Sequence, residues 1–189
     1  MESGYSAALS LAQGKLANIP VDEVCGNCGV RYADGEFYVP WFSRELPLSL
    51  APTAQKIIFL HYLTSRGAKT PAGRLMPYRE APGALFYEPN FIKRVVNPLV
   101  KRFGGDPEAL AAAGTALGGK MAENGDVSVV INVLPYVPVT YIIWRGDEEF
   151  GPSGSVLFDE TAKMWLCAED LVVLASLSVF ELIDYKNII

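Results

Sequence analysis

Residues 126–144, with the sequence DVSVVINVLPYVPVTYIIW, decide the fold class. Residues 126–134 and 139–144 are rich in β-branched and aromatic side chains, the types that strands favour. Only the short connection 135–138 separates these two runs. A link of this length predicts that the two strands pair in an antiparallel manner.

Weaker signals on both sides extend this picture. Further strands are expected over residues 30–32, 37–41, 75–79 and 154–158. Asp34-Gly35 separates the first two of these and is typical of a two-residue hairpin turn. Helices are expected over residues 3–18, 54–65, 91–97, 107–114 and 169–184. The strands of the second half follow one another without regularly alternating helices, so we predict an α+β fold with a mostly antiparallel sheet and flanking helices.

Several stretches are predicted to be connections. Pro20 and the glycine-rich residues 25–29 indicate a loop, and Pro47 with Pro52 indicates a linker. Pro98 is expected to kink or end the helix before it. None of these stretches has the length or composition of a domain boundary, so residues 1–189 are predicted to form a single domain.

Composition narrows the functional class. The chain has 189 residues, half of them hydrophobic, and a net charge of -5. It has no stripe of lysine and arginine, so we expect no nucleic-acid partner. The most apolar segment, 171–180, is shorter than the roughly 20 residues of a membrane span, and residues 1–16 lack the pattern of a secretory signal. Three cysteines make a poor disulfide framework, which favours a cytoplasmic location.

Residues 114–120, GTALGGK, have the spacing of a phosphate-binding loop. That loop requires a strand before it and a serine or threonine after the lysine. Here an alanine-rich helix precedes it and Met121 follows Lys120. We therefore expect only a connection between a helix and a strand.

Cys25 and Cys28 have the CxxC spacing of metal-binding or redox-active pairs. Together with Cys167 and His61 they supply four ligands, the number that a closed zinc site requires. The alternative is a pair of free thiols in a turn, with Cys167 as a small buried apolar residue. His61, the single histidine, is a candidate metal ligand or a half-buried residue with one hydrogen-bond partner.

A carboxylate-rich block offers a second kind of site. Asp147, Glu148 and Glu149 directly follow Trp144-Arg145-Gly146. Two such carboxylates can converge on a cation or share a proton, although three in a row cannot all face one site. The alternative is a solvated turn. If the block forms a polar site, Arg145 belongs to it, with residues 78–80 (Tyr-Arg-Glu) opposite.

Several motifs together resemble a known family. They are IIFLHYL at residues 57–63, MPYREAPGALFY at 76–87, FGGDPEAL at 103–110, PVTYIIWRGDEEFGPSGSVLFDE at 138–160 and LCAEDLVVL at 166–174. These stretches are similar to the family called domain of unknown function 3786, over about residues 5–183. The resemblance implies the setting of a strict anaerobe and a link to corrinoid or iron–sulfur proteins of one-carbon metabolism. It implies no catalytic residues.

Two functions therefore stay open. The first is an accessory cofactor-binding module, with His61 as axial ligand to a corrinoid or other tetrapyrrole. Tyr78, Arg79, Trp144 and Arg145 would complete that cofactor site. The second is a small carboxylate-based enzyme or protein-interaction domain that uses Arg145 and residues 147–149.

Overall fold

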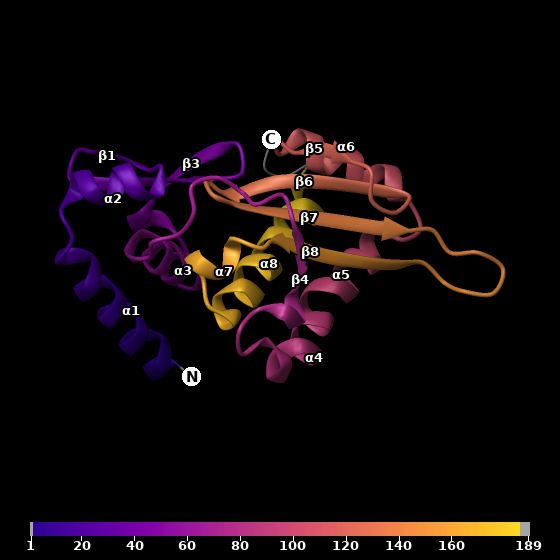
Figure 1. Ribbon diagram of the computed structural model, residues 1–189, viewed down its shortest axis with the longest axis horizontal. Helices are drawn as coiled ribbons and strands as arrows, with labels where there is room; N and C mark the ends of the chain where they lie inside the picture. The colour runs from indigo at the N-terminus through magenta and orange to yellow at the C-terminus, as the bar shows by residue number, and fades with distance from the viewer. Residues whose placement is uncertain (1, 186–189) are drawn as a thin grey trace.

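The computed structural model describes the backbone of residues 2–185 and the side chains of residues 6–185 (Figure 1). The helices are α1 (Glu2–Ala17), α2 (Val21–Cys28), α3 (Thr53–Thr64), α4 (Glu88–Phe91), α5 (Asn97–Phe103), α6 (Pro107–Ala116), α7 (Ala162–Trp165) and α8 (Ala168–Ile183). The strands are β1 (Arg31–Ala33), β2 (Glu36–Trp41), β3 (Arg44–Pro47), β4 (Leu75–Pro77), β5 (Lys120–Ala122), β6 (Val127–Leu134), β7 (Val137–Trp144) and β8 (Ser153–Asp159).

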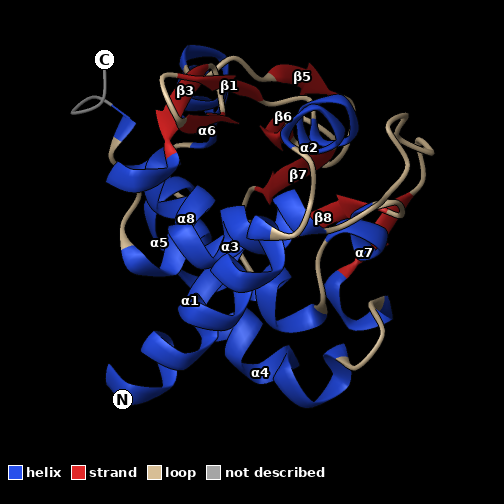
Figure 2. Cartoon of the chain, turned by 90° about the vertical axis from the view of Figure 1, so that its left-hand side faces the viewer, coloured by secondary structure: helices blue, strands red, loops and turns tan. Residues whose placement is uncertain are grey.

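The stretch that decides the fold class forms the middle of the main sheet. Strands β6 and β7 pair in an antiparallel manner with Val129 opposite Tyr141, and the sheet order is β4-β8-β7-β6-β5. All pairs of this sheet are antiparallel. Most helices lie on one side of the strands (Figure 2). The predicted α+β class and the single domain are therefore confirmed.

A smaller sheet, β1-β2-β3, lies near the N-terminal helices (Figure 1). Its first hairpin turns at Asp34 and Gly35, whose φ angles of 52° and 81° are those of the expected two-residue turn. No strand is expected at β3, which ends at Pro47, where the expected linker begins. It forms because it pairs with β2, with Arg44 opposite Trp41. The two strands are joined by the turn Phe42-Ser43, in which Phe42 has a φ of 57° where glycine or asparagine is usual, so the sequence does not signal this hairpin.

The loop predicted at residues 25–29 is wrong, because these residues belong largely to helix α2. Pro20 precedes the helix, and Asp22 and Glu23 lie in its first turn, where their negative charges interact favourably with the helix dipole. Gly29 ends it in the left-handed conformation, with a φ of 64°. The buried side chains of this helix, Val24 and Cys28, are one turn apart, and their packing offsets the glycine in its middle.

The irregularity predicted at Pro98 lies one turn earlier. Residues Ile92–Val96 form a π-helical turn, and helix α5 then continues from Asn97 to Phe103. A π turn widens the helix where the regular hydrogen-bond pattern is interrupted, so the chain tolerates the proline without ending the helix.

The glycine-rich residues 114–120 run from the last turn of helix α6 through the connection 117–119 into strand β5, so the expected order of helix, connection and strand is found. Lys120 is the first residue of that strand and lies opposite Val130 of β6. The stretch therefore has the wrong order of elements for a phosphate-binding loop, which runs from a strand into a helix.

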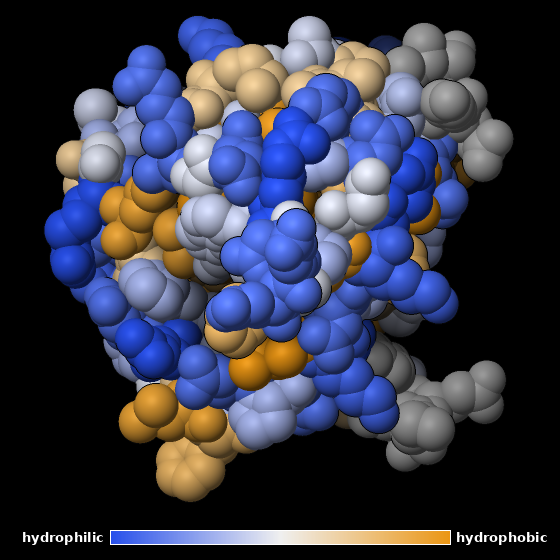
Figure 3. Space-filling view, turned by 90° about the vertical axis from the view of Figure 1, so that its right-hand side faces the viewer, coloured by the Kyte–Doolittle hydropathy of each residue, from blue (hydrophilic) through white to orange (hydrophobic). Residues whose placement is uncertain are grey.

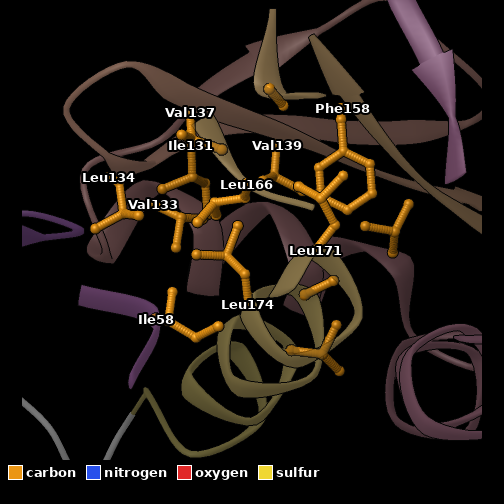
Figure 4. Packing of buried hydrophobic residues seen from close by; sticks show 14 of the residues in the cluster. Ile58, Ile131, Val133, Leu134, Val137, Val139, Phe158, Leu166, Leu171 and Leu174 are labelled. Atoms are coloured by element: carbon orange, nitrogen blue, oxygen red, sulfur yellow. The ribbon is translucent and has the colours of Figure 1, made fainter. Parts of the chain in front are cut away.

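Helix α8 is central to the core. Its Leu171 and Leu174 face Ile131, Val139 and Phe158 of the sheet, and Ile58 of helix α3 lies beside them (Figure 4). These side chains are all less than 2 % exposed. The burial of apolar side chains is the largest favourable contribution to folding. Within residues 2–185, none of the helices combines the length and the apolar character that crossing a bilayer requires.

Candidate functional site

His61 lies near the end of helix α3, at the edge of the interface with helix α8. Its neighbours Leu60 and Tyr62 are fully buried, whereas the imidazole is 35 % exposed. At the other end of α3, Gln55 lies near Leu177 of α8, while His61 meets Asp170 in the first turn of α8. Helices α3 and α8 therefore run antiparallel, and each end of the pair brings polar residues together.

Asp170 fixes the imidazole. Nδ1 of His61 lies 2.9 Å from Oδ1 and 3.0 Å from Oδ2 of the Asp170 carboxylate, which is largely buried. A carboxylate only accepts hydrogen bonds, so Nδ1 carries the proton. The hydrogen bond to Asp170 raises the pKa of His61, and partial burial opposes this. Within the described part of the chain, no hydrogen bond reaches Nε2, so its lone pair remains available in the neutral form.

Cys167 adds a third group to this cluster. Its thiol donates to Oδ2 of Asp170 over 3.2 Å, so the carboxylate links the thiol and the imidazole. Burial of the sulfur raises the pKa of Cys167, and the charge of Asp170 adds to this. The thiol therefore stays protonated at neutral pH and is not an activated nucleophile. Cys167 is an exposed residue, not the small buried one that was the alternative expectation, because it precedes α8 at the surface.

Tyrosines back the same end of α8. The hydroxyl of Tyr78 donates to the Ala168 carbonyl over 3.1 Å, and its ring stacks on Phe91 with centroids 4.3 Å apart. Burial raises the pKa of Tyr78 to about 12, so the hydroxyl remains a donor. The hydroxyl of Tyr87 donates to Glu169, the residue before Asp170. Tyr78 thus belongs to the surroundings of the His61 cluster.

Trp144 and Arg145 lie elsewhere. Trp144 is the last residue of β7 and lies opposite Ser153, and Arg145 follows it at the start of the loop on the far right of Figure 1, whereas α3 lies on the left. The guanidinium of Arg145 pairs with Glu108, and its backbone N–H donates to Asp126 over 2.7 Å. The structure therefore does not bring these two residues together with His61.

The carboxylate block shapes its own loop. Asp147 accepts hydrogen bonds from the backbone N–H groups of Glu149 and Phe150 at 2.8 Å and 2.7 Å, and the bond from Phe150 holds the pKa of Asp147 below its usual range. Glu148 and Glu149 are exposed. Figure 3 views the molecule from the end that carries this loop, and mostly hydrophilic side chains surround it. The arrangement is that of a solvated turn.

Residues 78–80 do not face this block. Glu80 lies 3.9 Å from Arg74, and Arg74 also pairs with Glu160, just past β8. The acidic loop precedes the first residue of β8, whereas Glu160 follows the last one. The two ends of this strand are roughly 20 Å apart at the rise of an extended strand. Arg79 is exposed in the 3-10 turn Tyr78–Glu80, which directly follows β4.

Of the CxxC pair, Cys28 is packed in the core between α2 and α3. Cys28 is fully buried, and its thiol donates to the carbonyls of Tyr62 and Leu63 at 3.5 Å and 3.7 Å. Burial raises the pKa of Cys28 to about 12, which disfavours the thiolate that zinc requires. Cys25 is half-buried, and all three cysteines are free. In residues 6–185, no three histidine, cysteine or acidic side chains are arranged to hold a metal ion.

Asp170 is the site residue that sequence reasoning missed. Its place near the start of a helix suggests only a favourable charge for the helix dipole. Its pairing with the histidine 109 positions earlier depends on how α3 packs on α8. Recognition of that contact from the sequence would require knowing the helix packing.

Comparison with known proteins gives a family and no activity. No curated protein and no solved structure matches the chain. The family model described as Domain of unknown function (DUF3786) matches residues 21–181, which include both sheets, helices α2 to α7 and all but the last two residues of α8. Since this match covers most of the chain, the protein belongs to the domain of unknown function 3786 family.

Proposed function

We propose that this protein is an accessory cofactor-binding module of anaerobic metabolism that offers Nε2 of His61 as an axial ligand to the metal of a corrinoid or related tetrapyrrole. The observation that carries the proposal is the hydrogen bond between Nδ1 of His61 and Asp170. Histidines that bind metals almost always donate their other ring N–H to a carboxylate or carbonyl. The cytoplasm is the setting in which such a module would act.

The donor set suits this class of cofactor. A tetrapyrrole already surrounds its metal with four ring nitrogens and needs from the protein only one or two axial ligands. His61 is one partly exposed imidazole held in a fixed orientation, and its carboxylate partner makes Nε2 more basic. When bound, the corrinoid would supply a cobalt centre able to carry a methyl group.

The surroundings supply apolar surface. Leu85 and Phe86 are 70 % and 90 % exposed and lie in the 3-10 turn that also contains Tyr87. Since Tyr87 bonds to Glu169, this turn adjoins the start of α8. A planar macrocycle can pack on such side chains. Corrinoid or iron–sulfur proteins of one-carbon metabolism are the proposed partners.

The test is a titration of the purified protein with aquocobinamide, a corrinoid that lacks a base of its own below the cobalt. The wild type should change the visible spectrum with a stoichiometry of one, and His61→Ala should abolish the change. Asp170→Asn should weaken binding by about 10- to 100-fold, because it removes the charge that orients the ring. Trp144→Ala is the control, because Trp144 is the last residue of β7, next to Ser153 and the loop that lies far from helix α3 (Figure 1).

Two results would overturn the proposal. One is an unchanged spectrum on titration of the wild type. The other is the same spectral change with His61→Ala, which would assign the nitrogen ligand to another group. Circular dichroism of each variant establishes that the fold is intact.

A further inference from the structure

A pocket opens at the other end of the α3–α8 pair. It has a volume of about 460 Å³ and lies between the end of β2, the start of α3 and the last turns of α8. Its lining includes Trp41, Arg44, Gln55, Phe180, Glu181 and Asp184. Ligand pockets are typically about 300–1,000 Å³ and combine apolar walls with a few polar groups. This one has the size for a small metabolite.

The amide oxygen of Gln55 is the first feature that points to a ligand. The residue lines the pocket although it is only 6 % exposed, and its Nε2 is completely covered, so Oε1 is the amide atom that a ligand can reach. Within the described part of the chain, no group donates a hydrogen bond to this oxygen. Buried polar groups are nearly always paired, and an amide oxygen can only accept. The pocket therefore suits a ligand with an N–H or O–H donor.

Helix α8 contributes two carboxylates to the wall. Oε1 of Glu181 accepts from Nε1 of Trp41 and from Nη2 of Arg44, whereas Oε2 accepts only from Nη2, at 2.9 Å. Arg44 thus offsets the charge of Glu181 and leaves Oε2 able to accept a second hydrogen bond. Asp184 is exposed, and its side chain forms no ion pair with the other described residues. Its charge is therefore available to a ligand.

The end of α8 strengthens this preference for positive charge. The helix ends at Ile183 with Asp184 as its C-cap, and its last turn contains no basic residue. The carbonyl groups at a helix C-terminus carry partial negative charge and attract cations. Together with the two carboxylates and the amide oxygen, they favour a cation over an anion, even though Arg44 lies on the same wall.

The remaining wall is apolar, which favours an organic cation over a metal ion. Leu177 is half-buried, and Phe180, one turn along α8, is 51 % exposed even though it is aromatic. Both line the pocket. An apolar substituent would be removed from water on this surface, and the face of a phenyl ring attracts a cation. Residues 6–185 also lack three histidine, cysteine or acidic side chains arranged to hold a metal ion.

We propose that this pocket binds a protonated primary amine with an apolar substituent. A primary ammonium group has three N–H donors, and the pocket offers it three acceptors, which are Oε1 of Gln55, Oε2 of Glu181 and the carboxylate of Asp184. The apolar substituent packs on Phe180. The proposal does not depend on a cofactor at His61, because the pocket is formed by other residues.

The test is calorimetric titration of the full-length protein with phenethylamine at neutral pH, where the amine is protonated. One molecule should bind per chain at millimolar concentration. Three analogues share the phenyl group: 2-phenylethanol has no charge, trimethylated phenethylammonium has the charge but no N–H donor, and 3-phenylpropionate has the opposite charge. Each should bind at least about tenfold more weakly than phenethylamine, because each leaves an acceptor or a charge of the pocket unpaired.

Matched variants locate the site. Gln55→Leu removes the acceptor from a protein that stays folded and should weaken the binding of phenethylamine at least about tenfold. Asp184→Asn removes the unpaired charge and should weaken binding about fivefold, because this carboxylate is exposed. Asp34→Asn makes the same change in net charge in the turn before β2, at the opposite end of that strand from Trp41, and should leave binding unchanged.

The outcomes that would overturn the proposal are distinct. One is the absence of binding of phenethylamine to the wild type. Another is equal or tighter binding of any of the three analogues, and 3-phenylpropionate in particular would show that the pocket prefers an anion. Unchanged binding in Gln55→Leu, or equal binding in Asp184→Asn and Asp34→Asn, would show that phenethylamine binds elsewhere.

Discussion

Helices α3 and α8 bring polar side chains together at both ends of their interface, and the two ends differ in how completely these groups are paired. At the His61 end, one carboxylate accepts hydrogen bonds from an imidazole and a thiol. At the Gln55 end, a buried amide nitrogen lacks a partner beside a pocket. The carboxylate at the His61 end is fully paired near the surface, whereas the Gln55 end contains a buried donor without a partner.

This difference suggests how the two ends act. A fully paired carboxylate holds His61 in one orientation before any ligand arrives, so little ordering remains to oppose binding. At the other end, an unpaired buried group lowers the stability of the folded protein. Replacing the central polar residue by an apolar one should therefore lower the free energy of unfolding at the His61 end and raise it at the Gln55 end.

The largest effect is expected for Glu181→Ala. The change leaves the buried Trp41 indole N–H without its acceptor and removes the partner of Arg44. We expect a loss of about 2–3 kcal/mol in the free energy of unfolding, because an unpaired buried donor costs more than a surface ion pair contributes. Urea denaturation measures it.

The exposed pair Arg31–Glu45 is the control for Glu181→Ala. Glu45→Ala should cost less than about 1 kcal/mol, since exposed ion pairs contribute little. A similar cost for both variants would mean that the Trp41–Arg44–Glu181 network is no better ordered than the surface.

A smaller effect of opposite sign is expected for Gln55→Leu. Leucine of similar size removes the unpaired amide and adds apolar surface between the helices, so the protein should gain about 1 kcal/mol in stability without ligand. Thermal denaturation measures the gain. A loss of stability would show that the amide is satisfied in solution and would remove the contrast between the two ends.

The sequence encodes the main sheet locally, because residues 126–144 carry strand propensity and a short connection together. It fails where an unusual turn or a contact from elsewhere decides the structure. Strand β3 depends on a two-residue turn that places Phe42 at a φ of 57°, and helix α2 depends on burying Cys28 against the end of α3. The glycines and prolines near these elements indicate loops until such contacts are known.

The candidate sites follow the same rule. His61 stands out in the sequence because it is the single histidine, and its chemistry is specific to its type. Gln55 and Glu181 do not stand out, because these residue types are usually solvated on helices. Only the packing of α3 on α8 makes Gln55 a buried donor, so no local pattern could have identified the pocket.

The smallest effect is expected at the His61 end and depends on pH. The hydrogen bond to Asp170 raises the pKa of His61 in the folded protein, so the added stability is fully present below the unfolded pKa of about 6.5 and is lost as the pH rises through the folded value. Since the ring is one-third exposed, we expect less than about 1 kcal/mol. The difference in the free energy of unfolding between the wild type and His61→Ala, measured by urea denaturation, should therefore be larger at pH 5.5 than at pH 9. His61→Gln keeps a donor without titrating and should remove the pH dependence of the difference. A gap that widens with rising pH would mean that the folded protein favours the neutral ring, and the His61 end would then resemble the Gln55 end in holding an uncharged donor.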